Sequence, residues 1–252
     1  MATLPVTPGP TTAPEPAPLS QAARIVNTFI APSKTFNDLR RNASWWAPWL
    51  LSSIVALVFV YAMDHQIGFE QISKNQVAHS SRAEQFEKLP PDQRAHQIQL
   101  SASIVRYASY GAPLLNIIFM VIMAGVLLAV FKFGANAGVT FKIALAIVFY
   151  GTLPYTISSL LGIVSMYAGV DPEGFNPQNP VATNPAYFMD LSGNKFLYGM
   201  ASALDVFVIW SIVLMGIGFS CNSKVKRGTA IALIAGLYFV YKLVASGLAS
   251  LG

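Results

Sequence analysis

The sequence predicts an all-α membrane protein, a polytopic bundle of five transmembrane helices preceded by an amphipathic N-terminal segment. Three observations predict this fold: apolar stretches of membrane length, a shortage of charged residues, and basic residues that recur in alternate loops. The chain has 252 residues, 54% of them hydrophobic and only 11% charged, whereas a soluble domain carries about 25% charged residues. The five apolar stretches are Trp46–Met63, Ala112–Phe131, Ile143–Tyr167, Phe196–Phe219 and Thr229–Leu251.

Each apolar stretch is predicted to be a helix that crosses the bilayer. A hydrocarbon core about 30 Å thick needs about 20 helical residues, and four of the stretches reach that length. The first, Trp46–Met63, has 18 residues and lies at the short end of the range. Because backbone amides cannot remain unpaired in lipid, a helix is the conformation expected for each stretch.

Composition divides the chain into three parts. Residues 1–19 form a tail rich in Pro, Thr and Ala that is predicted to be disordered. Residues 20–42 are predicted to form two short cytoplasmic amphipathic helices, one capped by Ser20 and ending at Ile30, the next capped by Ser33 and ending at Arg41. These helices fit an interfacial position on the membrane and equally a position packed under the bundle. Residues 43–252 form the five-helix domain.

Two long loops are expected on the side of the membrane opposite the N-terminus. Loop 64–106 is predicted to be partly helical, because Pro90-Pro91-Asp92 is a helix-start signal ahead of the second apolar stretch. Loop 169–195 contains four prolines and is predicted to be irregular.

Basic residues predict the orientation of the chain. Lys and Arg in short loops mark the cytoplasmic side of a membrane protein. The segments before the first stretch, between the second and third, and between the fourth and fifth share one side. They hold nine basic residues: Arg24, Lys34, Arg40, Arg41, Lys132, Lys142, Lys224, Lys226 and Arg227. The N-terminus is therefore predicted to be cytoplasmic and the C-terminus to lie outside, with a bacterial cytoplasmic (inner) membrane as the location.

Composition and motifs argue against several function classes. The net charge of +5 is spread along the chain, whereas nucleic-acid binding needs a clustered basic face. The single cysteine, Cys221, excludes an intramolecular disulfide, and Met1–Ser20 has no signal-peptide pattern. Neither a nucleophile elbow nor a phosphate-binding loop is present. His65, His79 and His96 lack the spacing of metal ligands, so no catalytic residue, metal or cofactor is predicted.

Aromatic residues and a proline mark local features of the first and third spans. Trp45, Trp46 and Trp49 stand at the entry of the first span, where indoles anchor helices at headgroup depth. Pro154 lies in the middle of the third span and Gly151 one turn earlier. Proline removes one helical hydrogen bond, so a kink is expected there.

Two ionisable residues interrupt the last two spans. Asp205 lies nine residues after Phe196, and Lys242 lies nine residues before Leu251. Because the two helices run antiparallel, both charges are expected about 14 Å from the outer end. A lone charge in the bilayer costs several kcal/mol, and pairing is its usual remedy. We therefore predict an intramembrane Asp205–Lys242 ion pair, structural or part of a proton or ion relay; snorkelling of Lys242 to the interface is the alternative.

An ordered set of short patterns resembles the Ypt-interacting-protein (Yip) domain family, most closely its bacterial branch. The set comprises Ile25–Pro32–Phe36, Trp45-Trp46-Ala47-Pro48, Phe149-Tyr150-Gly151-Thr152-Leu153-Pro154-Tyr155, and Gly216-Ile217-Gly218 ahead of Lys224–Arg227. The resemblance covers roughly Ile25 to Leu251. It implies a five-span membrane protein, and it supplies a fold and a membrane location more than a mechanism. Eukaryotic relatives associate with small prenylated GTPases, but the acidic Tyr-Gly-Pro-type motif of those relatives is not recognisable here.

These observations together predict a non-enzymatic integral membrane protein that acts in membrane organisation, scaffolding or partner recruitment. The expected partners are the lipid bilayer and, as open alternatives, a cytoplasmic protein or a second copy of the chain. The predicted cytoplasmic contacts to lipid or partner are Arg24, Lys34, Arg40, Arg41, Lys224, Lys226 and Arg227. The alternative function is a small transporter or channel component that uses the kinked third span and the Asp205 and Lys242 charges.

Overall fold

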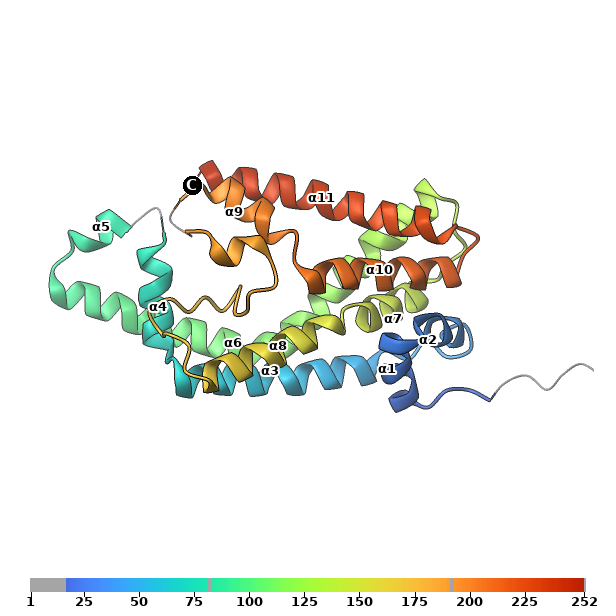
Figure 1. The fold of residues 1–252 in the computed structure, drawn as a ribbon, viewed down its shortest axis with the longest axis horizontal. Helices are drawn as coiled ribbons and strands as arrows, with labels where there is room; N and C mark the ends of the chain where they lie inside the picture. Colours follow the sequence, from blue (N-terminus) through green and yellow to red (C-terminus); the bar gives the residue numbers. More distant parts are fainter. Residues whose placement is uncertain (1–16, 81–82, 191–192, 252) are drawn as a thin grey trace, which may run out of the picture.

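Long apolar helices run along the longest axis of the molecule (Figure 1). The structure is a computed structural model that describes residues 17–80, 83–190 and 193–251. Over these residues it contains helices and no β-strand. The elements that form the body of the bundle are α3 (Trp46–Gln66), α6 (Pro91–Ala129), α7 (Phe141–Gly151), α8 (Pro154–Tyr167), α10 (Val206–Cys221) and α11 (Arg227–Leu251). The prediction of an all-α polytopic bundle is confirmed.

Within the part of the chain that the structure describes, four helical segments are long and apolar enough to cross a membrane. They are Trp46–Gln66, Pro91–Gly134, Phe141–Tyr167 and Arg227–Ser250. A fifth crossing exists if α9 (Lys195–Ser202) and α10 form one span, and these two helices are bent by 51°. The prediction of one continuous helix over Phe196–Phe219 was therefore wrong, because the chain leaves the helical conformation between Ser202 and Val206.

The third span is interrupted where the sequence predicted a kink, with α7 ending at Gly151 and α8 beginning at Pro154. Two threonine hydroxyls bond to carbonyls beside the interruption. Thr152 Oγ1 donates to Val148 O at 2.9 Å, and Thr156 Oγ1 donates to Leu153 O at 2.5 Å. A Cβ added at Gly151 would lie 3.4 Å from Met215 Cα. The small residue therefore lets α10 approach the end of α7 closely.

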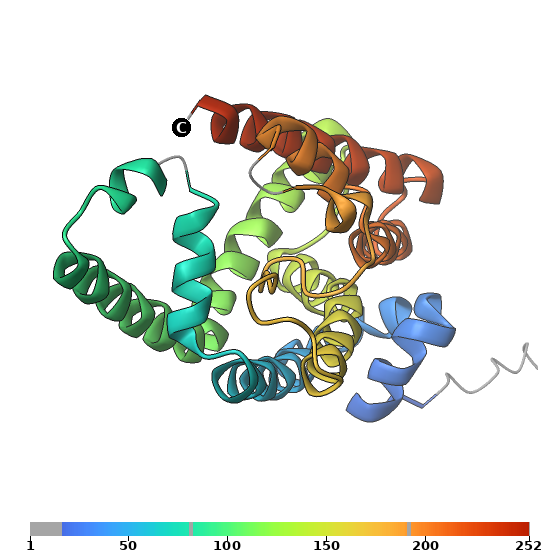
Figure 2. The same ribbon diagram turned by 60° about the vertical axis from the view of Figure 1, so that its left-hand side comes forward.

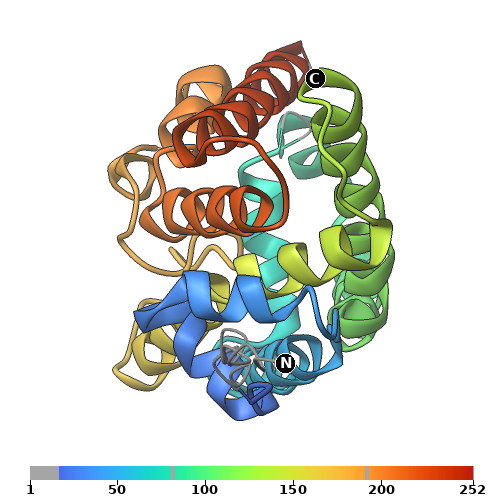
Figure 3. The ribbon, with the colours of Figure 1, turned by 90° about the vertical axis from the view of Figure 1, so that its right-hand side faces the viewer.

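The two ends of the bundle carry different elements. At one end lie α1 (Gln21–Ile30), α2 (Pro32–Asp38) and the π-turn η1 (Val130–Gly134), and Figure 3 views the molecule from this end. Ser20 caps α1 as predicted, but α2 begins at Pro32 with Ala31 as its N-cap, so the prediction of Ser33 as a cap was wrong. The C-terminal end of α11 lies at the opposite end of the bundle (Figure 1).

The opposite end is built from short helices and an irregular loop. It contains α4 (Phe69–Ala78), α5 (Ala83–Glu87), the N-terminal part of α6 and the short 3₁₀ helix η2 (Pro185–Phe188) (Figure 2). The helix α6 starts at Pro91, at the predicted helix-start signal, and continues without interruption into the membrane span. A small apolar cluster that includes Met63, Ile72 and Phe175 holds α3, α4 and the loop after α8 together.

The main core lies towards the α1–α2 end. Side chains of α2, α6, α7, α10 and α11 meet there, and Phe131 stacks on Phe219 with ring centroids 4.0 Å apart. A Cβ added at Gly216 would lie 2.8 Å from Ile231 Cα, and one at Gly218 would lie 3.0 Å from the Phe36 ring. The Gly216-Ile217-Gly218 pattern therefore allows close packing of α10, as a small-residue face does in membrane bundles.

Candidate functional site

The Arg24 side chain ties the first two helices together. Its guanidinium group forms an ion pair with Asp38 at 2.7 Å and donates to Asn42 O at 2.9 Å. The hydroxyls of Thr28 and Thr35 both donate to Arg24 O at 2.8 Å. Arg24 is only 1% exposed, so its predicted role as a lipid or partner contact was wrong. The Arg24 guanidinium group faces inward because it pairs with Asp38, a buried acid on the next helix.

The helix α1 has its polar face inside and an apolar face outside. Its buried residues are Arg24 and Thr28, whereas Val26 is 55% and Ile30 75% exposed. Phe29 lies between these faces and contacts the edge of Trp210, with ring centroids 5.6 Å apart. An exposed apolar face on a helix at the end of a membrane bundle suits insertion into the headgroup–acyl boundary.

The other eight predicted cytoplasmic cations are exposed, and the segments that carry them lie at the same end of the molecule (Figures 1 and 3). They come from the α2 region, the turn after α6, the start of α7 and the turn before α11: Lys34, Arg40, Arg41, Lys132, Lys142, Lys224, Lys226 and Arg227. Asp38 is the one acid among the described residues of these segments, and Arg24 neutralises it. This end therefore has a strong positive surplus, and we call it the basic end.

Side-chain contacts fasten the α2 region to the turn between α10 and α11. Arg40 donates to Cys221 O, and Arg227 Nη2 donates to Ser33 Oγ at 3.1 Å. Asn222 Nδ2 donates to Phe36 O at 2.9 Å. The basic residues from distant parts of the chain are thus held on one surface.

The three tryptophans at the start of α3 have different surroundings. Trp46 is 51% exposed, which suits a headgroup anchor. Trp45 stacks on Phe149 with centroids 5.0 Å apart, and Trp49 Nε1 donates to Pro113 O at 3.2 Å. Trp45 and Trp49 therefore contribute mainly to packing within the bundle.

Asp205 caps α10, the helix that follows the break after α9. Its Oδ1 accepts hydrogen bonds from the backbone N–H groups of Phe207 and Val208, at 2.8 and 3.2 Å. Its Oδ2 accepts from the Thr183 hydroxyl and from Asn184 Nδ2, the latter at 3.1 Å. A carboxylate at a helix N-terminus meets both unpaired amides and the positive end of the helix dipole.

Lys242 has a different partner. Its Nζ donates to Ser202 Oγ at 2.8 Å, and Ser202 Oγ donates in turn to Gly199 O at 2.8 Å. The predicted direct ion pair is not formed, since the break at residues 203–205 turns the Asp205 carboxylate towards the amides of α10 and the outer loop. Lys242 instead fastens α11 to α9.

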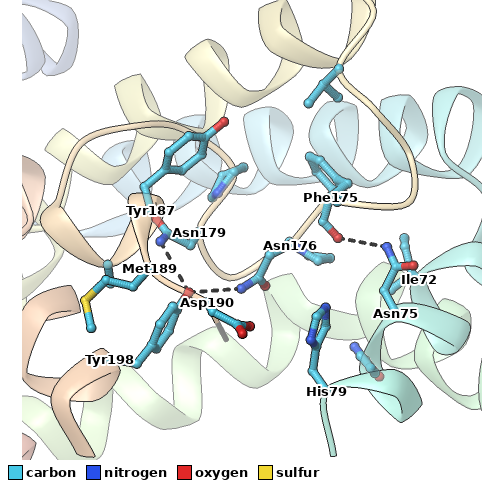
Figure 4. A pocket seen from close by; sticks show the side chains of 16 residues that line it. Ile72, Asn75, His79, Phe175, Asn176, Asn179, Tyr187, Met189, Asp190 and Tyr198 are labelled. Atoms are coloured by element: carbon cyan, nitrogen blue, oxygen red, sulfur yellow. Dashed lines mark hydrogen bonds between the residues drawn. The ribbon is translucent and has the colours of Figure 1, made fainter. Parts of the chain in front are cut away.

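A network of amide side chains connects the outer loop to this break. Asn176 and Asn179 donate to the Tyr198 hydroxyl at 3.3 and 3.4 Å (Figure 4). Asn179 and Asn184 exchange hydrogen bonds, and Asn184 continues to Asp205. The loop was predicted to be irregular, but nothing in the sequence analysis predicted this network. The density of Asn residues between prolines was the available signal.

Beside the network lies a cavity of about 380 Å³ between α4 and the outer loop, lined by both polar and apolar side chains. Asn75 closes one side by donating to Pro172 O at 2.8 Å and to Phe175 O at 3.2 Å. Figure 4 shows the bond to Phe175. His79 and Asp190 also line it. Over the described residues, no group of three His, Cys, Asp or Glu side chains is placed to hold a metal ion.

The architecture agrees with the comparison to known families. The Yip1 domain matches residues 26–248, which is most of the chain. The chain belongs to the Yip1 domain family. No curated protein and no solved structure matches it significantly. Membership of this family, together with the apolar helices, makes the Yip1 protein described here an integral, multi-pass membrane protein in contact with the lipid bilayer.

Replacing Arg24 tests the buried ion pair. Arg24→Met leaves the buried Asp38 carboxylate without its cation, which typically costs about 3–5 kcal/mol. We expect a correspondingly large loss of stability, measured as unfolding by denaturing detergent in mixed micelles. Lys34→Met, an exposed cation four residues before Asp38, is the matched control and should change stability by less than about 0.5 kcal/mol. Equal effects of the two substitutions would contradict the assignment.

A double-mutant cycle tests the separate roles of Asp205 and Lys242. Asp205→Ala removes a helix cap and should cost about 0.5–2 kcal/mol, whereas Asp205→Asn retains an acceptor oxygen and should cost less. Combining Asp205→Ala with Lys242→Met should give additive losses within about 0.5 kcal/mol. A large coupling energy in the same unfolding assay would indicate the direct ion pair instead.

Proposed function

We propose that this Yip1 protein organises the membrane around it by gathering anionic lipid at its basic end, without catalysing a reaction. The topology we propose has five crossings in a bacterial cytoplasmic membrane, with the basic end on the cytoplasmic side and the C-terminus outside. The cytoplasmic leaflet carries the negative surface potential that attracts such basic segments, and the excess of Lys and Arg favours that side.

One observation carries the proposal: eight exposed cations share one end of the bundle while the acid among them is buried against Arg24. The exposed apolar side chains of α1, Val26 and Ile30, lie at the same end. Electrostatic attraction and apolar insertion therefore act on the same membrane surface, a combination that strengthens interfacial binding.

Transport is the less favoured function. It was predicted from the kinked third span and the Asp205 and Lys242 charges, and these two side chains have other hydrogen-bond partners. The Asp205 carboxylate is already fully engaged as a cap and loop anchor, which gives it a structural role.

Charge removal at the basic end tests the proposed function. The protein would be reconstituted in nanodiscs of phosphatidylcholine in which a fifth of the lipid is phosphatidylglycerol. Native mass spectrometry would then count the phosphatidylglycerol molecules that stay bound to the protein when it is released from the nanodisc. Each basic residue near the surface contributes about 1 kcal/mol to attraction of anionic lipid, and 1.4 kcal/mol is tenfold in affinity. Lys224→Gln with Lys226→Gln should therefore weaken retention at least about tenfold.

The matched control removes two exposed lysines from the other end of the molecule. Lys74→Gln with Lys88→Gln changes net charge equally and should leave retention unchanged. Equal losses in both double variants, or no loss in either, would overturn the proposal. Retention of phosphatidylcholine provides the internal reference for general lipid binding.

A further inference from the structure

A second cavity lies within the membrane-spanning part of the bundle. It has a volume of about 760 Å³ and is lined by residues of α3, α6, α7, α8, α10 and α11. This volume falls within the range of small-molecule sites, about 300–1,000 Å³. None of its lining residues carries a charge, so the cavity offers no counter-ion to a charged ligand.

Polar groups without partners face this cavity. Ser211 on α10 is 1% exposed and lines it, and Ser211 Oγ has no hydrogen-bond partner. Asn116 on α6 also lines it, and its side chain forms no hydrogen bond with another described residue. An unpaired polar group in an apolar environment costs on the order of 1–3 kcal/mol. A ligand that bonds to these groups would recover that free energy.

The cavity opens sideways towards the lipid. Lining residues of α6 are among the exposed side chains of the molecule, including Phe119 at 60% and Ile122 at 59%. On α11 the lining residue Tyr241 is 63% exposed. In a bilayer this opening faces hydrocarbon, so the accessible ligands are those dissolved in the membrane.

We propose that this cavity binds an uncharged amphiphile from the bilayer, a hydrocarbon chain that ends in a hydroxyl or carbonyl group. The apolar lining of α6 and α11 receives the chain, and the Ser211 hydroxyl and Asn116 amide receive its polar end. A phosphate-bearing headgroup is excluded because the lining lacks cations. The site is independent of the basic end, since no residue of that surface lines the cavity.

Photo-cross-linking in nanodiscs tests the site directly. The probe is hexadecanol with a diazirine in its chain, added to the full-length protein in phosphatidylcholine nanodiscs, with adducts mapped by peptide mass spectrometry. We expect adducts on cavity-lining peptides of α6 and α10, reduced at least fivefold by excess hexadecanol and not by excess hexadecyl phosphate. Two outcomes would overturn the proposal: adducts only on lipid-facing peptides outside the cavity, or equal competition by hexadecanol and hexadecyl phosphate. Either would show that the probe contacts the protein only as ordinary annular lipid does.

Variants keep the test specific. Ala56→Phe fills the cavity from a half-buried lining position of α3, whereas Leu57→Phe adds volume at a neighbouring lipid-facing position. The first should lower cavity adducts at least fivefold and the second should not. Asn116→Leu keeps the number and branching of the side-chain heavy atoms but removes the amide. When unlabelled hexadecanol and hexadecane are compared as competitors, this variant should reduce the advantage of hexadecanol. Equal labelling of Ala56→Phe and wild type, with both proteins folded in the detergent-unfolding assay, would also overturn the site.

Discussion

Backbone hydrogen bonding in lipid is the constraint on which this structure depends. Because no water is available in the hydrocarbon core, each interruption of a helix must be satisfied by the protein itself. The break between α9 and α10 is satisfied by the Asp205 carboxylate, which caps α10. The break in the third span is accompanied by the hydroxyls of Thr152 and Thr156. The helices beside these breaks, α7, α8 and α10, border the open and mostly apolar intramembrane cavity.

The buried Arg24–Asp38 pair has a consequence beyond stability. Among the described residues before α3 it buries the one acid, Asp38, whereas Lys34, Arg40 and Arg41 remain exposed at the surface. The same contacts place the apolar side of α1, which carries Val26 and Ile30, on the outside of the molecule. One interaction therefore produces both features that suit the basic end to an anionic membrane surface. The structure thus links a buried contact to a proposed membrane function.

The all-α membrane fold could be predicted from the sequence because hydrophobic length is a direct physical requirement of the bilayer. The helix starts at Ser20 and Pro91 could be predicted because capping and proline signals are local. The inward position of Arg24 could not, since it depends on Asp38 being brought close by the turn between two helices. The partner of Asp205 was also predicted wrongly. The apolar character of the whole stretch Phe196–Phe219 does not reveal that the helix breaks within it, or that Asp205 caps the helix after the break. The intramembrane cavity arises because helices that are distant in the sequence do not pack against one another completely. The hydrophobic periodicity of each helix carries no information on the packing between helices.

Side-specific labelling of introduced cysteines tests the central claim, that the chain crosses the membrane an odd number of times with its basic end in the cytoplasm. In a Cys221→Ser background, single cysteines would replace Lys226, Lys74 and Ser250, and an impermeant maleimide would be added to intact and permeabilised cells. The account predicts that positions 74 and 250 are labelled in intact cells and position 226 only after permeabilisation. Labelling of positions 226 and 250 from the same side would contradict it.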